Sequence, residues 1–376
     1  KRMNIVLIGP YYPYRGGISD TNLELCETLK DLGHNVKIIS FKLLYPSLLF
    51  PGKSQFVKKN SKQKISSQRI INSINPLNWI FTCKLINDIN PELVISTYWT
   101  PFLSPSLSFI NNKINKNIFK IGIIHNAYPH EKKLFQKIFL KFFLNSINKY
   151  VTLSKNVYKQ VNLISRSKKG KELFHPIPNK FGEPINKEIA KKKIGLKTNY
   201  KYLLFFGLIR KYKGLEILIN SMAEITRNRK DIKLLIVGEN YESKNRYKKL
   251  INKNNLENSI YFVNNFIDQK DVKYWFCSSE LIIQPYIKAS QSGITPLSFQ
   301  FETPTVCTNI PGLSDQIINN TNGFISEPNS RNLAQQILIA LNTNLTNIKK
   351  EIRKKKLNLT WKNFVIKLLK ETKNDK

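Results

Sequence analysis

The chain has 376 residues, of which 41% are hydrophobic and 23% are charged. This composition excludes a disordered chain, and the length predicts about two domains. The 61 Lys and Arg residues outnumber the 25 Asp and Glu residues, for a net charge of +36. Such a surface attracts anionic lipid, phosphate-bearing substrates or nucleic acid, unless the lysines are only a solvated surface produced by compositional bias.

Secretion, membrane crossing and metal binding are not expected. The apolar runs are far shorter than the ~18 residues of a membrane span, and the segment 5–8 is too short for the core of a signal peptide. The four cysteines are scattered, without a Cys-x-x-Cys pair. No Asp-x-Asp occurs, and no cluster of His, Asp and Glu has metal-ligand spacing. We therefore expect a cytoplasmic, metal-independent protein without cofactors and with reduced cysteines.

In chain order, the first half predicts alternating strands and helices. A buried strand at 4–9 leads into a loop with Gly16 and Gly17, and a helix from about residue 18 ends at Gly33. Two adjacent glycines after a strand allow close backbone approach to a ligand, although they are more often a simple turn. Later strands are expected at 36–40, 93–96, 119–124 and 150–154, helices at 76–89 and 131–144, and loops at 58–75 and 165–171.

The second half repeats the pattern after an extended, proline-limited link at 174–179. A strand at 203–206 stops at Gly207, and a helix at 216–227 follows Arg210, Lys213 and Gly214. Positive side chains beside a helix N-terminus favour phosphate binding, and an ordinary turn with solvated lysines is the alternative. Strands at 232–237, 260–263 and 281–284 and helices at 247–253 and 270–277 predict a second parallel, doubly wound sheet.

The stretch F-F-G-L-I-R-K-Y-K-G-L-E at 205–216 resembles the diphosphate-binding loop of retaining family 4 glycosyltransferases. Further matches are Gly16-Gly17, His125, the strand entry E-T-P-T-V at 302–306 and I-P-G-L at 310–313. The resemblance implies an α/β GT-B fold, with two doubly wound Rossmann-like domains facing across a cleft. It places an acceptor-side domain at 1–182, a nucleotide-sugar domain at 183–355, and a C-terminal helix at 356–376 that crosses back to the first domain.

The same resemblance implies a retaining glycosyltransferase. A UDP- or GDP-sugar would be the donor and a glycan or lipid-linked molecule the acceptor, in bacterial cell-surface polysaccharide or lipopolysaccharide synthesis. The protein would lie in the cytoplasm, peripherally on the inner face of the membrane. The residues it points to are, as catalytic groups, His125, Arg210 and Lys213; as donor ligands, Gly16, Gly17, Gly207, Gly238, Glu239, Gln291, Ser292, Gly293 and Ile294; and on the acceptor side, Arg15, His130 and Glu131.

Two departures from the family pattern leave alternatives open. Aligned on Pro304, the family's two glutamates fall at Ala289 and Leu297, and a Gln-Ser-Gly loop around Gln291 resembles a bacterial branch of the family. The basic residue stands at Arg210, two positions beyond the usual one. Loss of the glutamates also fits a non-catalytic partner of another transferase, and the charge alone suggests nucleic-acid binding, for which no recognised module appears.

Three further segments have two interpretations each. His125, at the end of a strand, is either a ligand for the donor sugar or a structural histidine. The aromatic segment 41–56 resembles an acceptor-side loop or is an ordinary surface excursion. The amphipathic helix at 131–144 either packs on the sheet or uses a lysine-rich face to contact anionic lipid.

Overall fold

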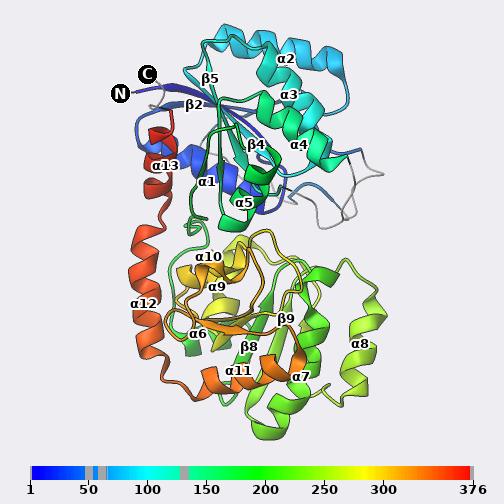
Figure 1. The fold of residues 1–376 in the computed structure, drawn as a ribbon. Helices are drawn as coiled ribbons and strands as arrows, with labels where there is room; N and C mark the ends of the chain where they lie inside the picture. Colours follow the sequence, from blue (N-terminus) through cyan, green and yellow to red (C-terminus); the bar gives the residue numbers. More distant parts are fainter. Residues whose placement is uncertain (1, 47–53, 58–64, 66, 128–134, 373–376) are drawn as a thin grey trace. The chain divides into compact units, whose positions relative to one another are not determined.

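The computed structural model describes residues 2–46, 54–57, 65, 67–127 and 135–372. The chain divides into two compact units: unit 1 comprises residues 1–176 and 361–376, and unit 2 comprises residues 177–360 (Figure 1). The first passage between units thus lies between Pro176 and Ile177, earlier than the 182/183 boundary expected from the sequence. The chain returns to unit 1 at Trp361 rather than at residue 356.

Unit 1 is built on a parallel sheet with the strand order β3-β2-β1-β4-β5-β6-β7. The order reverses between β1 and β4, and in open α/β sheets the carboxyl ends at such a reversal are where ligands bind. Its strands are β1 (Asn4–Ile8), β2 (Asn35–Leu43), β3 (Ser67–Asn72), β4 (Leu93–Tyr98), β5 (Phe119–Ile124), β6 (Lys149–Thr152) and β7 (Gly170–Glu172).

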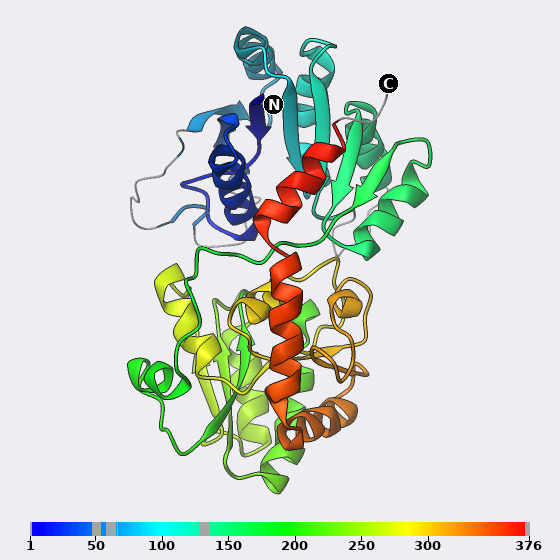
Figure 2. The same ribbon diagram turned by 90° about the vertical axis from the view of Figure 1, so that its left-hand side faces the viewer.

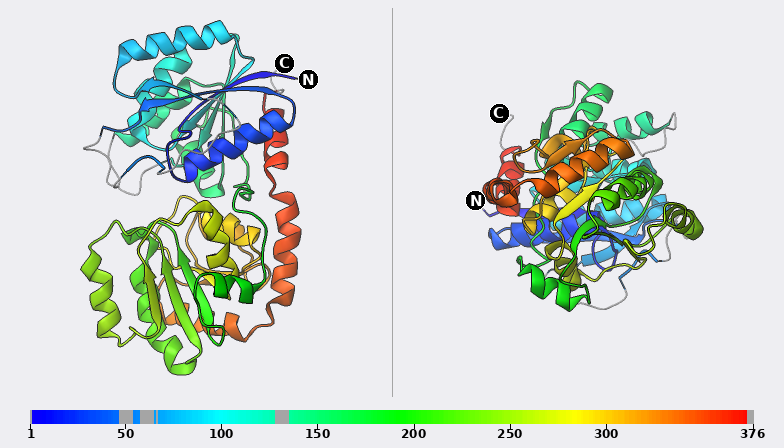
Figure 3. Two further views of the ribbon diagram at one scale, coloured as in Figure 1. Left: turned by 180° about the vertical axis from the view of Figure 1, so that it is seen from behind. Right: turned by 90° about the horizontal axis from the view of Figure 1, so that it is seen from below.

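Helices cover both faces of this sheet. Helices α1 and α13 bury Leu25, Leu29, Phe364 and Leu368 against one face, and Figures 2 and 3 show α1 and α13 lying across it. The other helices pack on the opposite face. The bounds are α1 (Gly17–Asp31), α2 (Pro76–Ile89), the short 3-10 helix η2 (Pro101–Leu103), α3 (Ser104–Lys113), α4 (Gln136–Asn145), α5 (Lys155–Ile164) and α13 (Trp361–Lys370).

Unit 2 repeats this architecture with the strand order β10-β9-β8-β11-β12-β13. Every strand pairing in it is parallel, and its order reverses between β8 and β11. Its elements are α6 (Lys187–Lys193), β8 (Lys201–Phe206), η3 (Lys211–Lys213), α7 (Leu215–Asn228), β9 (Ile232–Val237), α8 (Lys244–Lys253), β10 (Ile260–Val263), α9 (Gln269–Cys277), β11 (Leu281–Gln284), α10 (Ile294–Gln300), β12 (Thr305–Thr308), η4 (Ser314–Gln316), β13 (Phe324–Ser326), α11 (Ser330–Asn342) and α12 (Leu345–Asn358).

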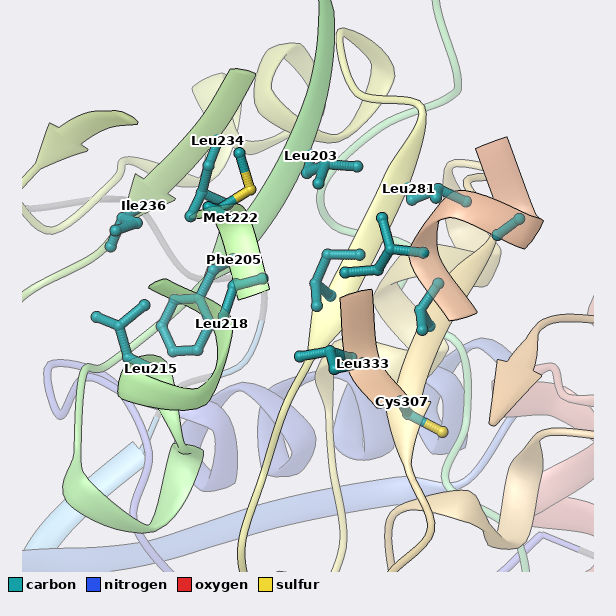
Figure 4. Packing of buried hydrophobic residues seen from close by; sticks show 14 of the residues in the cluster. Leu203, Phe205, Leu215, Leu218, Met222, Leu234, Ile236, Leu281, Cys307 and Leu333 are labelled. Carbon is teal, nitrogen blue, oxygen red and sulfur yellow. The ribbon is translucent and has the colours of Figure 1, made fainter. Parts of the chain in front are cut away.

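The core of unit 2 fixes where β8 ends and α7 begins. Leu203 and Phe205 of β8 lie in one buried cluster with Leu218 and Met222 of α7, as Figure 4 shows. Burying an aliphatic or aromatic side chain of this size contributes roughly 1.5–3 kcal/mol. Because both elements are held by such contacts, the loop between them, residues 207–214, has little freedom in where it begins and ends.

Some expectations about secondary structure were wrong. The segment 58–75 was expected to be loop, yet β3 forms within it; this strand is at the sheet edge, where a mostly polar sequence with one apolar pair suffices. The charged loop expected at 165–171 overlaps β7, which is the other edge strand. Among the helices of the described ranges, none has the length and apolar composition that a membrane crossing requires.

Candidate functional site

The loop after β8 changes direction at two glycines. Gly207 has φ of +101° and Gly214 has φ of +64°, a backbone region that side chains disfavour. A Cβ on Gly214 would also lie 1.9 Å from the carbonyl oxygen of Pro285, in the loop after β11. Only glycine therefore allows the loops after β8 and β11 to approach this closely. Between the two glycines, the single turn η3 carries Lys213 into the protein.

Lys213 is a buried cation. Its side chain is 8% exposed, and its Nζ lies 5.4 Å from the ring centroid of Tyr286. A Cβ on Gly207 would be 3.1 Å from this Nζ and 3.6 Å from Cδ1 of Ile294, so the ammonium turns back over Gly207. Burial, and secondly the charge of Arg210, lower the pKa of Lys213 to about 8. None of the ion pairs within the described ranges includes Lys213.

Arg210 lies where the loops after β8 and β9 are joined. Ile209 bridges to Asn240, and the Ile209 N–H donates to the carbonyl oxygen of Glu239 over 2.9 Å. The guanidinium carbon of Arg210 lies 4.4 Å from the ring centroid of Tyr241, whose hydroxyl donates to Oε2 of Glu239 over 3.3 Å. Tyr241 therefore holds the guanidinium on its ring face and the carboxylate at its hydroxyl.

Gly238 permits this junction. Its φ is +150°, and a Cβ there would lie 1.9 Å from the carbonyl oxygen of Gly207. The predicted donor glycines Gly207 and Gly238 are thus in contact with each other. Their requirement for glycine comes from packing of one loop on the other.

The loop after β11 is held by a hydrogen-bond chain. Gln284 donates through Nε2 to Oγ1 of Thr295 over 2.9 Å and accepts from the Ser292 hydroxyl over 2.6 Å. The N–H of Ile294 donates to Oγ of Ser292 over 3.2 Å. Two of the groups expected to hold phosphate, the Ser292 hydroxyl and the Ile294 N–H, are therefore bonded to each other.

The positions that align with the family's two glutamates are apolar and buried. Ala289 lies in the cluster that contains β8 and α7, and Leu297 lies in the cluster on the opposite face of the sheet. Neither position brings a carboxylate to the loops described above. Gln291, by contrast, is half-buried beside Ser292 in the loop itself.

In unit 1, the glycine loop lines a cavity of about 150 Å³. Gly16 caps α1 with φ of +115°, and a Cβ on either glycine would meet no atom within 4 Å. The segment 54–57 closes one side, because the Arg15 N–H donates to the carbonyl oxygen of Gln55 over 3.0 Å. The lining residues are Pro10, Tyr14, Arg15, Gly16, Gly17, Ile18, Ser19, Leu44, Tyr45, Gln55 and Trp99.

Two of the aromatic walls of this cavity are fixed by one hydrogen bond. Trp99 donates through Nε1 to the Tyr45 hydroxyl over 2.9 Å. The pKa of Tyr45 is raised to about 12, chiefly by burial, so the phenol stays protonated. The cavity thus combines rigid aromatic faces, an amide and a basic residue.

His125 follows β5 and is 2% exposed. Its backbone N–H donates to the carbonyl oxygen of Tyr98 over 2.8 Å. Burial, and secondly His175, lower the pKa of His125 to about 3. The imidazole is therefore neutral at physiological pH, so it can serve as a hydrogen-bond group but not as a general acid there.

The structure gathers most of the expected site residues within their own units. Arg15, Gly16 and Gly17 share the unit 1 cavity, and the loops after β8, β9 and β11 meet in unit 2. His130 and Glu131 lie outside the described residues. Within the described ranges, no group of three or more His, Cys, Asp or Glu residues is placed to hold a metal ion.

Sequence reasoning missed the aromatic frame around the basic residues. Tyr212 lies edge-to-face with Tyr286 at 6.2 Å, and its carbonyl oxygen accepts from the Ile287 N–H over 2.8 Å. Burial, followed by Tyr212, raises the pKa of Tyr286. No local pattern in the sequence signals this frame, because Tyr212 and Tyr286 are far apart in the chain.

The match to a family model falls in unit 2, the unit that holds these loops. Residues 186–357 match the family model for glycosyl transferases group 1, and the matched residues all lie within unit 2. The chain is 26% identical over 227 residues to an uncharacterized glycosyltransferase, MJ1059, from Methanocaldococcus jannaschii, covering 54% of this chain and 55% of that protein. It is 26% identical over 151 residues to the lipopolysaccharide core biosynthesis mannosyltransferase LpsB from Rhizobium meliloti, covering 39% and 42%. Each of these two matches spans about half the length of the relative concerned.

Solved structures resemble the whole chain. Sucrose-phosphate synthase from Thermosynechococcus elongatus gives a TM-score of 0.80 at 16% identity, covering 99% of this chain and 98% of that one. HepE from Anabaena in complex with UDP gives 0.75 at 15% identity, covering 98% and 99%. These similarities, with the two parallel sheets, confirm the predicted GT-B fold.

Proposed function

We propose that the chain is a retaining glycosyltransferase of the family 4 type that transfers a sugar from a nucleotide-diphosphate sugar to a glycan or lipid-linked acceptor. The observation that carries this proposal is Lys213, a buried cation beside Arg210 that lies at the carboxyl end of β8, where the strand order reverses. Such a cation is costly to bury without a counter-charge. A diphosphate supplies that charge.

The basic pair then acts on the leaving group. When the bond between the anomeric carbon and the diphosphate oxygen breaks, negative charge grows on the diphosphate. Lys213 provides a point charge, and the planar guanidinium of Arg210 can donate two hydrogen bonds to one phosphate. Both groups bind the departing diphosphate more strongly than the intact donor. Interactions that strengthen in the transition state raise turnover rather than affinity alone. In this proposal the protein itself, without a metal, supplies the positive charge.

Unit 1 supplies the remaining groups. We assign neutral His125 to hydrogen bonding with the donor sugar, Gly16 and Gly17 to the donor, and the cavity beside Arg15 to the acceptor. The rings of Tyr45 and Trp99 suit the apolar face of a sugar, and Gln55 is an amide for its hydroxyls. Relatives of similar fold support the ligand class: HepE structures contain UDP, glucose and UDP-glucose.

The acceptor class is inferred from the named relatives and from the charge. LpsB acts in lipopolysaccharide core biosynthesis, and the structurally similar WaaG is involved in lipopolysaccharide biosynthesis. Together with the net charge of +36, this favours a growing cell-surface glycan at the inner face of a bacterial membrane. We infer a peripheral location there, and the Gln-Ser-Gly loop as the substitute for the family's carboxylates.

A non-catalytic GT-B partner is the second candidate, favoured by Ala289 and Leu297. Turnover separates the two. Wild-type protein is incubated with UDP- and GDP-sugars and a lipid-linked glycan, and nucleotide diphosphate release is measured beside Lys213→Ala. We expect turnover in the wild type and a loss of at least ~100-fold in the variant, the scale for removing a preorganised charge-stabilising group. Nucleotide binding without turnover on any acceptor would favour the partner role, and unchanged turnover in Lys213→Ala would remove the diphosphate assignment.

A further inference from the structure

Helix α2 of unit 1 has apolar residues on both of its sides. One side packs on the sheet through Trp79, Cys83 and Ile86. The opposite side carries Leu77 and Phe81 at i, i+4 spacing, with Ile80 beside them, and these side chains are 55–76% exposed. A helix of a globular protein usually presents polar residues on its outer face. The outer face of α2 is therefore available for an apolar environment.

Helix α4 repeats this arrangement on the same face of the sheet. It buries Leu140, Phe143 and Leu144. Phe135, immediately before the helix, and Ile138 and Phe142 within it form a stripe at i, i+3, i+7 spacing, and these are 51–66% exposed. The buried and exposed apolar groups lie on opposite sides, because positions 140 and 144 fall about half a turn from 138 and 142. Of the helix expected at 131–144, residues 136–144 lie in α4 and pack on the sheet as expected, whereas residues 131–134 lie outside the described ranges. This packing leaves three large apolar groups in solvent.

The two helices belong to one layer that is rich in lysine. Helix α3 contacts both α2 and α4, and the Asn115 N–H just beyond α3 donates to Oδ1 of Asn87 in α2 over 2.9 Å. Asp88 is the single acidic residue in the ranges 76–89, 104–116 and 136–145. Exposed lysines in the same ranges are Lys84 on α2, Lys113 and Lys116 at the end of α3, and Lys137 and Lys141 on α4.

We propose that this layer docks on an anionic lipid bilayer through the α2/α4 surface, which consists of Leu77, Ile80, Phe81, Phe135, Ile138 and Phe142 with the five lysines Lys84, Lys113, Lys116, Lys137 and Lys141. The proposal takes the peripheral location from the proposed function and adds the surface and the lipid. Helices that lie in the bilayer interface combine exposed aromatic and aliphatic residues with lysines in this way. The lysines select negatively charged headgroups, which distinguishes a bilayer from a neutral apolar partner.

The test uses the whole chain and vesicles of phosphatidylglycerol mixed with phosphatidylcholine, compared with vesicles of phosphatidylcholine alone. The variant Leu77→Ser/Phe81→Ser/Phe142→Ser removes three exposed groups of the surface. The matched control, Ile189→Ser/Ile339→Ser/Leu357→Ser, removes three similarly exposed apolar groups from α6, α11 and α12 of unit 2. We expect wild type and control to bind the anionic vesicles equally. The surface variant should bind at least about tenfold more weakly, since its groups enter the interface.

A charge variant tests the lipid preference. Lys84→Gln/Lys137→Gln/Lys141→Gln should weaken vesicle binding by about fivefold per lysine, and added salt should reduce the difference. Lys248→Gln/Lys249→Gln/Lys253→Gln, which changes exposed lysines of α8 in unit 2, should have little effect. Circular dichroism confirms folding of each variant.

Three outcomes would overturn the proposal. The first is equal vesicle binding by the surface variant and its control, and the second is equal binding of the wild type to anionic and to neutral vesicles. The third is self-association of the wild type in size-exclusion chromatography that the surface variant loses while its vesicle binding is unaltered. The last outcome would make the surface an interface between copies of the chain. Nucleotide-induced thermal stabilisation is measured on the same variants and should not change, so failure of membrane docking and failure of the donor site are distinguished.

Discussion

Replacing Lys213 by methionine removes the buried ammonium and keeps a side chain of similar length. The pKa of Lys213 falls from its usual 10.5 to about 8 in the folded protein. A difference of about 2.5 pKa units corresponds to roughly 3 kcal/mol at 1.36 kcal/mol per unit. Since the folded pKa lies below the unfolded one, this penalty is fully present below pH 8 and disappears as the pH rises towards 10.5. Lys213→Met should therefore stabilise the free protein by about 3 kcal/mol at pH 7.

The assay is calorimetry in a buffer free of phosphate, followed through the transition of unit 2. For a unit of this size, 3 kcal/mol corresponds to a rise in Tm of roughly 6–12 °C. The increase should shrink between pH 8 and pH 10. Lys211→Met is the matched control, because it removes an exposed charge from the same turn and should leave Tm nearly unchanged. A Tm difference between Lys213→Met and wild type that does not vary with pH would refute the reasoning.

Three further predictions concern binding, catalysis and packing. The affinity of the wild type for a nucleoside diphosphate, measured by titration calorimetry, should fall as the pH rises above about 8, because Lys213 of the ligand-free protein then loses its proton. The weak binding of Lys213→Met should lack this pH dependence. The turnover of the wild type should show no inflection from His125 between pH 5 and pH 8, since its pKa is about 3; a His125→Gln variant whose profile loses an inflection near pH 6.5 would contradict this. Gly214→Ala should lower the free energy of unfolding of unit 2 by ~1–3 kcal/mol, because φ is +64° and the new Cβ would clash with the Pro285 carbonyl oxygen. The measurement is denaturant unfolding. An unchanged midpoint would show that the loops after β8 and β11 are not in contact.

The buried strands and the glycine turns could be predicted because each depends on local sequence. Strands such as β5 and β9 are continuous apolar runs, which parallel sheets covered on both faces require. Gly207 and Gly214 lie at the two ends of the β8–α7 loop, and both have positive φ. Glu302 has φ of +53°, so this turn forms with a residue type that disfavours it, and the local sequence did not predict it.

Edge strands and side-chain contacts between loops could not be predicted in the same way. β3 and β7 each have one neighbouring strand, so they lack the long apolar pattern of the central strands. The hydrogen bond from Ser292 to Gln284 joins a loop residue to a strand residue, and no periodic pattern in the sequence predicts it. The burial of Lys213 depends on Tyr286, which is distant in the sequence; from the sequence alone its charge gave no sign of its environment.

The donor site is tested most directly by thermal unfolding of the wild type and Lys213→Ala with UDP, GDP, ADP and CMP at fixed high salt. A ligand at 100 times its Kd should stabilise the folded protein by about 2.7 kcal/mol. We predict that one nucleoside diphosphate raises the Tm of the wild type and leaves that of Lys213→Ala unchanged. Absence of stabilisation by every nucleotide, or equal stabilisation of both proteins, would contradict the assignment of Lys213 to the diphosphate.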